Sequence, residues 1–260
     1  MAARENIKRG TDIYSIEKQI REKENLAHEK RYNVVITIDG PTASGKSSTA
    51  IAVAQKLGFY YLNTGFLYRA LTYLLLTTRG YSQDGLSNVK QEDIDVCTNS
   101  DFFSYSYNAT TGYSVVYKNI DITSFLKDVT IDTCVALISP QKLVRKAITE
   151  QQRSLAGKHS IVVDGRDVGS HVFPFAQYKF YLTASLNIRA QRWQHDQALR
   201  GNSYTIQEAE QRIHERDLSD EQRIISPLII PSGAIIIDNS FMTREETVRK
   251  IISYINNAIA

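Results

Sequence analysis

Val34-Val35-Ile36-Thr37-Ile38-Asp39-Gly40-Pro41-Thr42-Ala43-Ser44-Gly45-Lys46-Ser47 is the most informative stretch of this chain. Its second half fits the pattern G-x-x-x-x-G-K-[ST], and the pattern follows an apolar, β-branched run. Apolar residues then recur at helical spacing from Ser48 to Leu57. A strand, a glycine-rich loop and a helix in this order predict a phosphate-binding loop rather than an incidental turn.

The chemistry of such a loop follows from its residue types. Two glycines let successive backbone N–H groups turn inward around a polyphosphate. Lys46 is positioned to reach the β- and γ-phosphates, and the Ser47 hydroxyl is a candidate ligand for Mg²⁺. We therefore expect ATP and Mg²⁺ as cofactors. The residues expected to hold the nucleotide are Gly40, Pro41, Thr42, Ala43, Ser44, Gly45, Lys46, Ser47 and Ser48.

Composition narrows the class of protein. The chain has 260 residues, of which 31 are Lys or Arg and 28 are Asp or Glu. This small excess of positive charge predicts no nucleic-acid binding, and the lack of any long apolar run predicts no membrane partner. Cys97 and Cys134 lie far apart without metal-ligand spacing, which favours buried free thiols. The N-terminus has no apolar signal core, so we expect a cytoplasmic protein, acting as a monomer on small molecules.

Further along the chain, apolar runs alternate with helical patterns. This predicts an α/β fold with a parallel sheet and helices on both faces. The expected strands are 34–38, 161–163, 179–182 and 234–237. Residues 102–107 and 113–117 predict a β-hairpin inside an inserted substrate-side subdomain, 81–130. Residues 1–32 form a charged extension before one domain, 33–260.

Three further groups of residues suggest chemistry. Arg69 is expected to start a helix, where its guanidinium suits a phosphate. Residues 161–169 form a buried-type strand that runs into an Asp-Gly-Arg-Asp loop, and Asp164 could hold Mg²⁺-bound water as a Walker-B acid does. An arginine-rich segment, 190–222, is expected to form a mobile lid, since phosphoryl transfer requires charge neutralisation and exclusion of water.

The order of these motifs resembles the bacterial cytidylate (CMP/dCMP) kinases from about Val34 to the C-terminus. The resemblance rests on the phosphate loop and on the motifs Thr64-Gly65, Tyr68-Arg69-Ala70, Val144-Arg145, Asp164-Gly165-Arg166-Asp167-Val168-Gly169, Val172-Phe173-Pro174, Leu182-Thr183-Ala184-Ser185, Arg216-Asp217, Asp220, Arg223 and Pro227-Leu228. A series of motifs in order is far more specific than any one of them.

The resemblance implies ATP-dependent phosphoryl transfer to CMP and dCMP, and it implies a role for each site residue. Arg145, Arg166 and Asp167 would read the cytosine and its monophosphate. Arg69 would help to place the acceptor phosphate, while Arg216 and Asp220 would face the sugar. Arg189 and Arg223 would act with Lys46 on the transferring phosphoryl group.

Six positions depart from the family pattern: Asn63, Phe66, Ala136, Lys142, Phe175 and Trp193. Asn63 replaces a usual aspartate, Ala136 replaces a serine that often contacts the nucleoside, and Trp193 replaces a second lid arginine. Two alternatives therefore stay open: a related kinase with another acceptor, and a nucleotide-binding module with low turnover.

Overall fold

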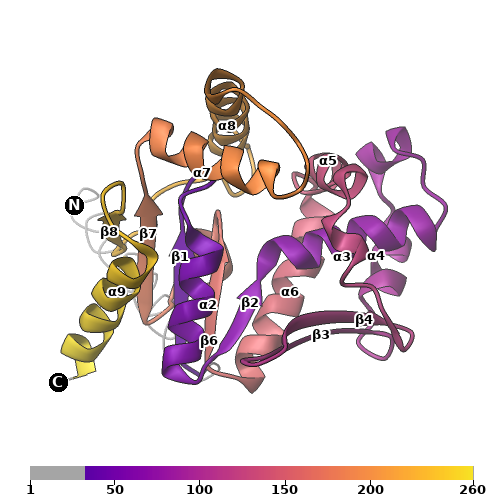
Figure 1. Ribbon diagram of the computed structural model, residues 1–260. Helices are drawn as coiled ribbons and strands as arrows, with labels where there is room; N and C mark the ends of the chain where they lie inside the picture. Colours follow the sequence, from indigo (N-terminus) through magenta and orange to yellow (C-terminus); the bar gives the residue numbers. More distant parts are fainter. Residues whose placement is uncertain (1–32, 260) are drawn as a thin grey trace, which may run out of the picture.

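The computed structural model describes residues 33–259, so the predicted extension 1–32 lies outside the described residues. A five-stranded sheet has the order β2-β6-β1-β7-β8, and all its neighbouring strands run parallel (Figure 1). The strands are β1 (Val35–Asp39), β2 (Tyr60–Asn63), β6 (Ile161–Gly165), β7 (Tyr178–Thr183) and β8 (Ile235–Asp238). Because β1 leads to β2 on one side while β7 and β8 lie on the other, the sheet has its topological switch point at β1.

Helices cover both faces of the sheet, as predicted. Ile36 and Ile38 of β1 pack with α2 (Lys46–Leu57) and α9 (Arg244–Ile259), whereas Val35 packs with α3 (Thr64–Thr77) and α6 (Lys142–Lys158). Successive strand residues point to opposite faces, so one short apolar run supplies both cores. The parallel α/β architecture is therefore confirmed.

The four predicted strands are confirmed within one or two residues at each end, but β2 was missed. Its four residues carry two tyrosines and an asparagine, which gave no apolar run to detect. The prediction that Arg69 starts a helix was wrong, because α3 begins at Thr64. The Asn63 side chain accepts the Phe66 N–H at 3.1 Å and caps that helix.

The predicted hairpin is present as β3 (Phe103–Asn108) and β4 (Gly112–Tyr117), which pair antiparallel and are followed by β5 (Ile120–Asp121). Its tyrosines bind β2: the Tyr60 hydroxyl donates to the Tyr105 carbonyl at 3.0 Å, and the Tyr105 hydroxyl donates to the Tyr61 carbonyl at 3.2 Å. The 3₁₀ turns η1 (Asp84–Asn88) and η2 (Phe125–Lys127) and the helices α4 (Gln91–Thr98) and α5 (Val129–Ile138) complete this side of the molecule (Figure 1). The subdomain boundaries at 81 and 130 stay a prediction.

Two helices, α7 (Leu186–Ala198) and α8 (Ile206–Glu221), pack together beyond the end of the sheet where β1 leads into the phosphate loop (Figure 1). Ala190, Ala209 and Ile213 form their small shared core, against which Trp193 packs. The Thr205 side chain and Glu208 form a capping box that fixes the start of α8. Within residues 33–259, no helix is both long and apolar enough to cross a membrane.

Gly40 joins β1 to the phosphate loop and passes very close to β7. Its φ is +148°, and a Cβ at this position would lie 2.0 Å from the Leu182 carbonyl oxygen. No side chain fits between two backbones at that distance, so glycine is required here.

We expect Gly40→Ala to lower the free energy of unfolding by about 3 kcal/mol or more, because β1 and β7 must separate. Urea unfolding followed by circular dichroism measures this. Gly58→Ala is the matched control: its φ is +66° but no atom lies within 4 Å of the added Cβ, so it should cost only about 1–2 kcal/mol. Equal costs at the two sites would contradict the close-approach explanation.

Candidate active site

The phosphate loop runs from β1 into α2, and Lys46 is the first helical residue. Gly45 caps the helix with a φ of +87°, which turns the loop backbone toward the helix N-terminus. The Lys46 side chain folds back across the loop, where its ammonium group donates to the Pro41 carbonyl at 2.5 Å and to the Ser44 hydroxyl at 3.3 Å. Burial, together with nearby Arg166, holds the pKa of Lys46 well below its ordinary value. A bound polyphosphate would relieve both effects.

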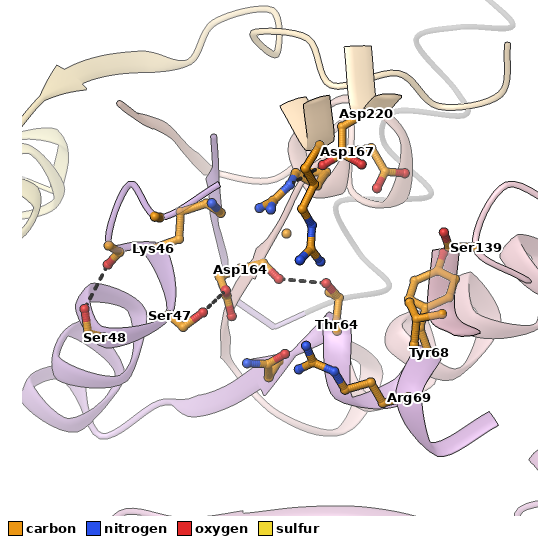
Figure 2. A pocket seen from close by; sticks show the side chains of 18 of the residues that line it. Lys46, Ser47, Ser48, Thr64, Tyr68, Arg69, Ser139, Asp164, Asp167 and Asp220 are labelled. Atoms are coloured by element: carbon orange, nitrogen blue, oxygen red, sulfur yellow. Dashed lines mark hydrogen bonds and ion pairs between the residues drawn. The ribbon is translucent and has the colours of Figure 1, made fainter. Parts of the chain in front are cut away.

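Asp164 lies beside the loop because β6 pairs with β1, with Ile38 opposite Asp164. The Ser47 hydroxyl donates to one carboxylate oxygen at 2.6 Å (Figure 2), and the Tyr61 hydroxyl donates to the other at 2.8 Å. The Asn63 amide in turn donates to the Tyr61 hydroxyl at 2.9 Å. Burial raises the pKa of Asp164, although these hydrogen bonds oppose the shift.

The oxygen atoms at this point suit Mg²⁺, which prefers hydroxyl, carboxylate and phosphate oxygens. Ser47 and Asp164 supply a hydroxyl and a buried carboxylate side by side. Among residues 33–259, no group of three His, Cys, Asp or Glu side chains could hold a metal alone. The donor set therefore fits an ion that takes its remaining ligands from substrate phosphates and water.

A cavity of about 580 Å³ connects the loop with α3, the α5–α6 junction, the loop after β6, and the helices α7 and α8. The predicted residues that line it are Ala43, Gly45, Lys46, Ser47, Ser48, Arg69, Arg145, Asp164, Arg166, Asp167, Arg216, Asp220 and Arg223. Gly40, Pro41, Thr42, Ser44 and Arg189 do not line it. Residues far apart in sequence thus meet in one cavity, as phosphoryl transfer between two substrates requires.

Opposite the phosphate loop, Arg145 and Asp167 form a buried ion pair. Arg145 is only 4% exposed, and its guanidinium also donates to the Ser139 carbonyl at 3.1 Å. The same guanidinium lies over the Tyr68 ring, 5.9 Å from its centroid. This corner of the cavity combines a fixed acceptor, fixed donors and an aromatic face, which is a suitable set for a planar base.

Further ion pairs hold three more guanidinium groups around the cavity. Arg166 binds Asp220 at 2.7 Å and donates to the Gly40 carbonyl at 3.2 Å, and Arg223 binds the second oxygen of Asp220. Arg69 binds Asp132 of α5. Its guanidinium also lies over the Phe66 ring, with 5.6 Å to the centroid.

The two arginines at the start of α7 have different partners. Arg189 is held by Asp217 and donates to the Thr42 carbonyl at 3.0 Å, so its predicted role at the phosphoryl group stays a prediction. Arg192 lines the cavity instead. Arg192 lies within the predicted lid segment 190–222 but was not among the predicted site residues; its place three residues after Arg189 on one helix was an available signal.

Other residues that line the cavity were not predicted as site residues: Asn63, Thr64, Gly65, Tyr68, Val135, Ser139, Gly165 and Asp196. Ala136 is exposed and outside the lining, while its neighbours Val135 and Ser139 lie one turn apart and face the cavity. Trp193 packs on Tyr204 within the α7–α8 pair, with 4.9 Å between ring centroids. Neither Ala136 nor Trp193 therefore lines the cavity, whereas Val135, Ser139 and Arg192 near them do.

Asp39 supports the site from behind. It is fully buried, and its carboxylate accepts the Val168 and Gly169 N–H groups at 2.8 and 2.7 Å. These two residues open η3 (Val168–Val172), a single π-helical turn after Asp167. A Cβ on Gly169 would lie 2.8 Å from Asp39, so this contact leaves no room for a side chain.

Burial raises the pKa of Asp39 from 3.8 to about 7. Between these values the folded protein binds more protons at this group than the unfolded chain does. The contribution of Asp39 to stability therefore falls as pH rises from about 4 to about 7 and is constant above that.

We expect the unfolding free energy of the wild type minus that of Asp39→Asn to fall as pH rises over this range, with a slope approaching about 1.4 kcal/mol per pH unit. Urea unfolding at pH 4 to 8 measures it. The variant is expected to be less stable at every pH, because an amide cannot accept both N–H groups. The test is therefore how the difference changes with pH, and not its size at any one pH. A difference that does not vary with pH would contradict the raised pKa.

Comparison with known proteins gives one consistent result. The model of the family described as cytidylate kinase matches residues 36–257. Relatives named cytidylate kinase include one from Desulfitobacterium hafniense, 33% identical over 87% of this chain and 94% of its own, and one from Caldanaerobacter subterraneus, 36% identical over 84% and 92%. A third, from Clostridioides difficile, is 35% identical over 86% of this chain and 99% of its own. This chain belongs to the cytidylate kinase family.

Proposed function

We propose that this protein transfers the γ-phosphoryl group of ATP to CMP and dCMP, giving ADP and CDP or dCDP. An oxygen of the acceptor phosphate attacks the γ-phosphorus, and the bond to the oxygen that bridges the β- and γ-phosphates breaks. The observation that carries the proposal is the meeting of the phosphate loop, Asp164 and the Arg145–Asp167 pair around one cavity.

ATP would occupy the phosphate-loop side. Backbone N–H groups of residues 43–48 and the positive end of α2 favour its phosphates. Lys46 would leave the Pro41 carbonyl for the β- and γ-phosphates, a change favoured because its buried charge then gains an anionic partner. Mg²⁺, held at Ser47 and through water at Asp164, would neutralise charge on these phosphates.

CMP or dCMP would occupy the opposite side. Cytosine presents an amino donor beside two acceptors, so the Asp167 carboxylate and the Arg145 guanidinium complement its edge. Uracil would present a carbonyl oxygen to the same carboxylate and be disfavoured. Arg69 and Arg166 would bind the acceptor phosphate, and Arg216 with Asp220 would face the sugar.

The segment 190–222 would act as a lid. Its arginines, with Arg189 and Arg223 at its margins, would neutralise charge on the transferring group and exclude water. No covalent intermediate is needed, because positioning and charge neutralisation are enough for this reaction. The two substrates would need to approach from opposite walls of the cavity, which is the arrangement that the lining residues favour.

The acceptor is identified by measuring ADP release with ATP and Mg²⁺ against separate CMP, dCMP, UMP, AMP and GMP. We expect turnover with CMP and dCMP, and a loss of at least about 100-fold in kcat for Lys46→Ala. Lys179→Ala is the matched control, since Lys179 is outside the cavity lining. Turnover with a different acceptor would favour a related kinase, and nucleotide binding without turnover would favour a binding module.

A second test concerns recognition of the base. We expect Asp167→Asn to reduce the ratio of kcat/KM for CMP over UMP by about 10–100-fold, since an amide can turn either a donor or an acceptor toward the base. Steady-state kinetics with both acceptors measure the ratio. The KM for ATP and the thermal unfolding midpoint show whether the change is local, because the substitution also removes the partner of a buried arginine. An unchanged ratio in a folded variant would contradict the assignment of Asp167.

A further inference from the structure

Asn239 lies directly after β8 and is 4% exposed. Its amide joins two parts of the active site. The Nδ2 group donates to the Ser44 carbonyl in the phosphate loop at 3.1 Å. The Oδ1 atom accepts a hydrogen bond from Arg192 Nη1 at 3.0 Å, while the Asn239 backbone carbonyl accepts one from Arg192 Nη2 at 3.0 Å. One residue therefore binds both nitrogens of the guanidinium fork and the loop beside it.

The position of this contact points to the donor phosphates. A Cβ on Gly45 would lie 3.6 Å from the Asn239 amide nitrogen and 3.9 Å from Arg192 Nη1. Gly45 caps α2, where the backbone N–H groups of the phosphate loop converge. Arg192 also lines the cavity, so the guanidinium that Asn239 orients lies at the wall where a polyphosphate would bind.

Arg192 is held differently from most of the other arginines around the cavity. Arg69, Arg145, Arg166 and Arg223 each have a carboxylate partner. Among residues 33–259, Arg192 forms no ion pair. An amide can fix the direction of a guanidinium without cancelling its charge, whereas a carboxylate does both. Arg192 is thus oriented and still free to attract an anion.

We propose that Asn239 is a positioning residue for the donor nucleotide, which aims Arg192 at the phosphates of ATP and holds the phosphate loop at Ser44. The side chain at position 239 must be uncharged for this role. A carboxylate there would form an ion pair with Arg192 and would repel the Ser44 carbonyl. The inference rests on the proposed use of ATP, but not on CMP as the acceptor.

The test is calorimetric titration of each folded variant with Mg·ATP alone and with CMP alone. We expect Asn239→Asp to raise the dissociation constant for Mg·ATP by about tenfold or more and to leave that for CMP within about twofold. Asn239→Ser, which keeps a neutral donor and acceptor, should recover part of the loss. Asn187→Ala is the matched control, since Asn187 bonds Glu210 at 3.2 Å and lies outside the cavity lining.

A double-mutant cycle with Arg192→Ala separates positioning from folding. If Asn239 acts through Arg192, Asn239→Asp should weaken Mg·ATP binding far less in the Arg192→Ala background than in the wild type. Unchanged ATP affinity in Asn239→Asp, or an equal loss in both backgrounds, would overturn the proposal. No titration step needs turnover, so lack of CMP phosphorylation would count against the proposed function and not against this inference.

Discussion

The parallel pairing of β1 with β6 is the constraint on which the active site depends. Its register sets Asp39 opposite Gly165, so the two strands end together and both loops emerge at one edge. The phosphate loop and the Asp-Gly-Arg-Asp loop then lie within hydrogen-bonding distance: Arg166 donates to the Gly40 carbonyl, and the Asp39 carboxylate accepts the amides that follow Asp167. A shift of one residue in this pairing would turn Asp39 and Asp164 to the wrong faces of the sheet.

Several arginines lie around one cavity, and their like charges repel one another. The protein holds most of them with carboxylates, of which Asp220 serves both Arg166 and Arg223. The arginines that are paired in this way are held in place before substrates bind, which lowers the entropy that binding must remove. Asn239 holds Arg192 in a different way, since its oxygens fix the direction of the guanidinium without a negative charge.

The edge of the sheet that carries Asp164 is supported from the hairpin side of the molecule. Tyr105 of β3 bonds the backbone of β2, and Tyr61 of β2 bonds Asp164. The Phe66 ring, which replaces a small family residue, packs on Tyr113 of β4 with 4.5 Å between ring centroids. These aromatic residues thus link the hairpin, β2 and α3 behind the Asp164 carboxylate. Asn63 belongs to the same network through its bonds to Tyr61 and to the start of α3.

Local sequence determined the phosphate loop, four strands, the hairpin and most residues of the site, because glycine spacing, β-branched runs and ordered motifs are properties of short segments. It did not determine that residues 60–63 form β2 or that Arg192 lines the cavity. Nor did it determine that Ser139 and not Ala136 lines the cavity, or that Asn239 contacts Arg192 and the phosphate loop. Each of these depends on which segments meet in space. Asn239 follows Ser44 by 195 residues, and only the packing of β8 beside β7 brings its amide to the loop. An asparagine carries no sign of its partner in the sequence, since its two polar atoms bond equally well in many settings.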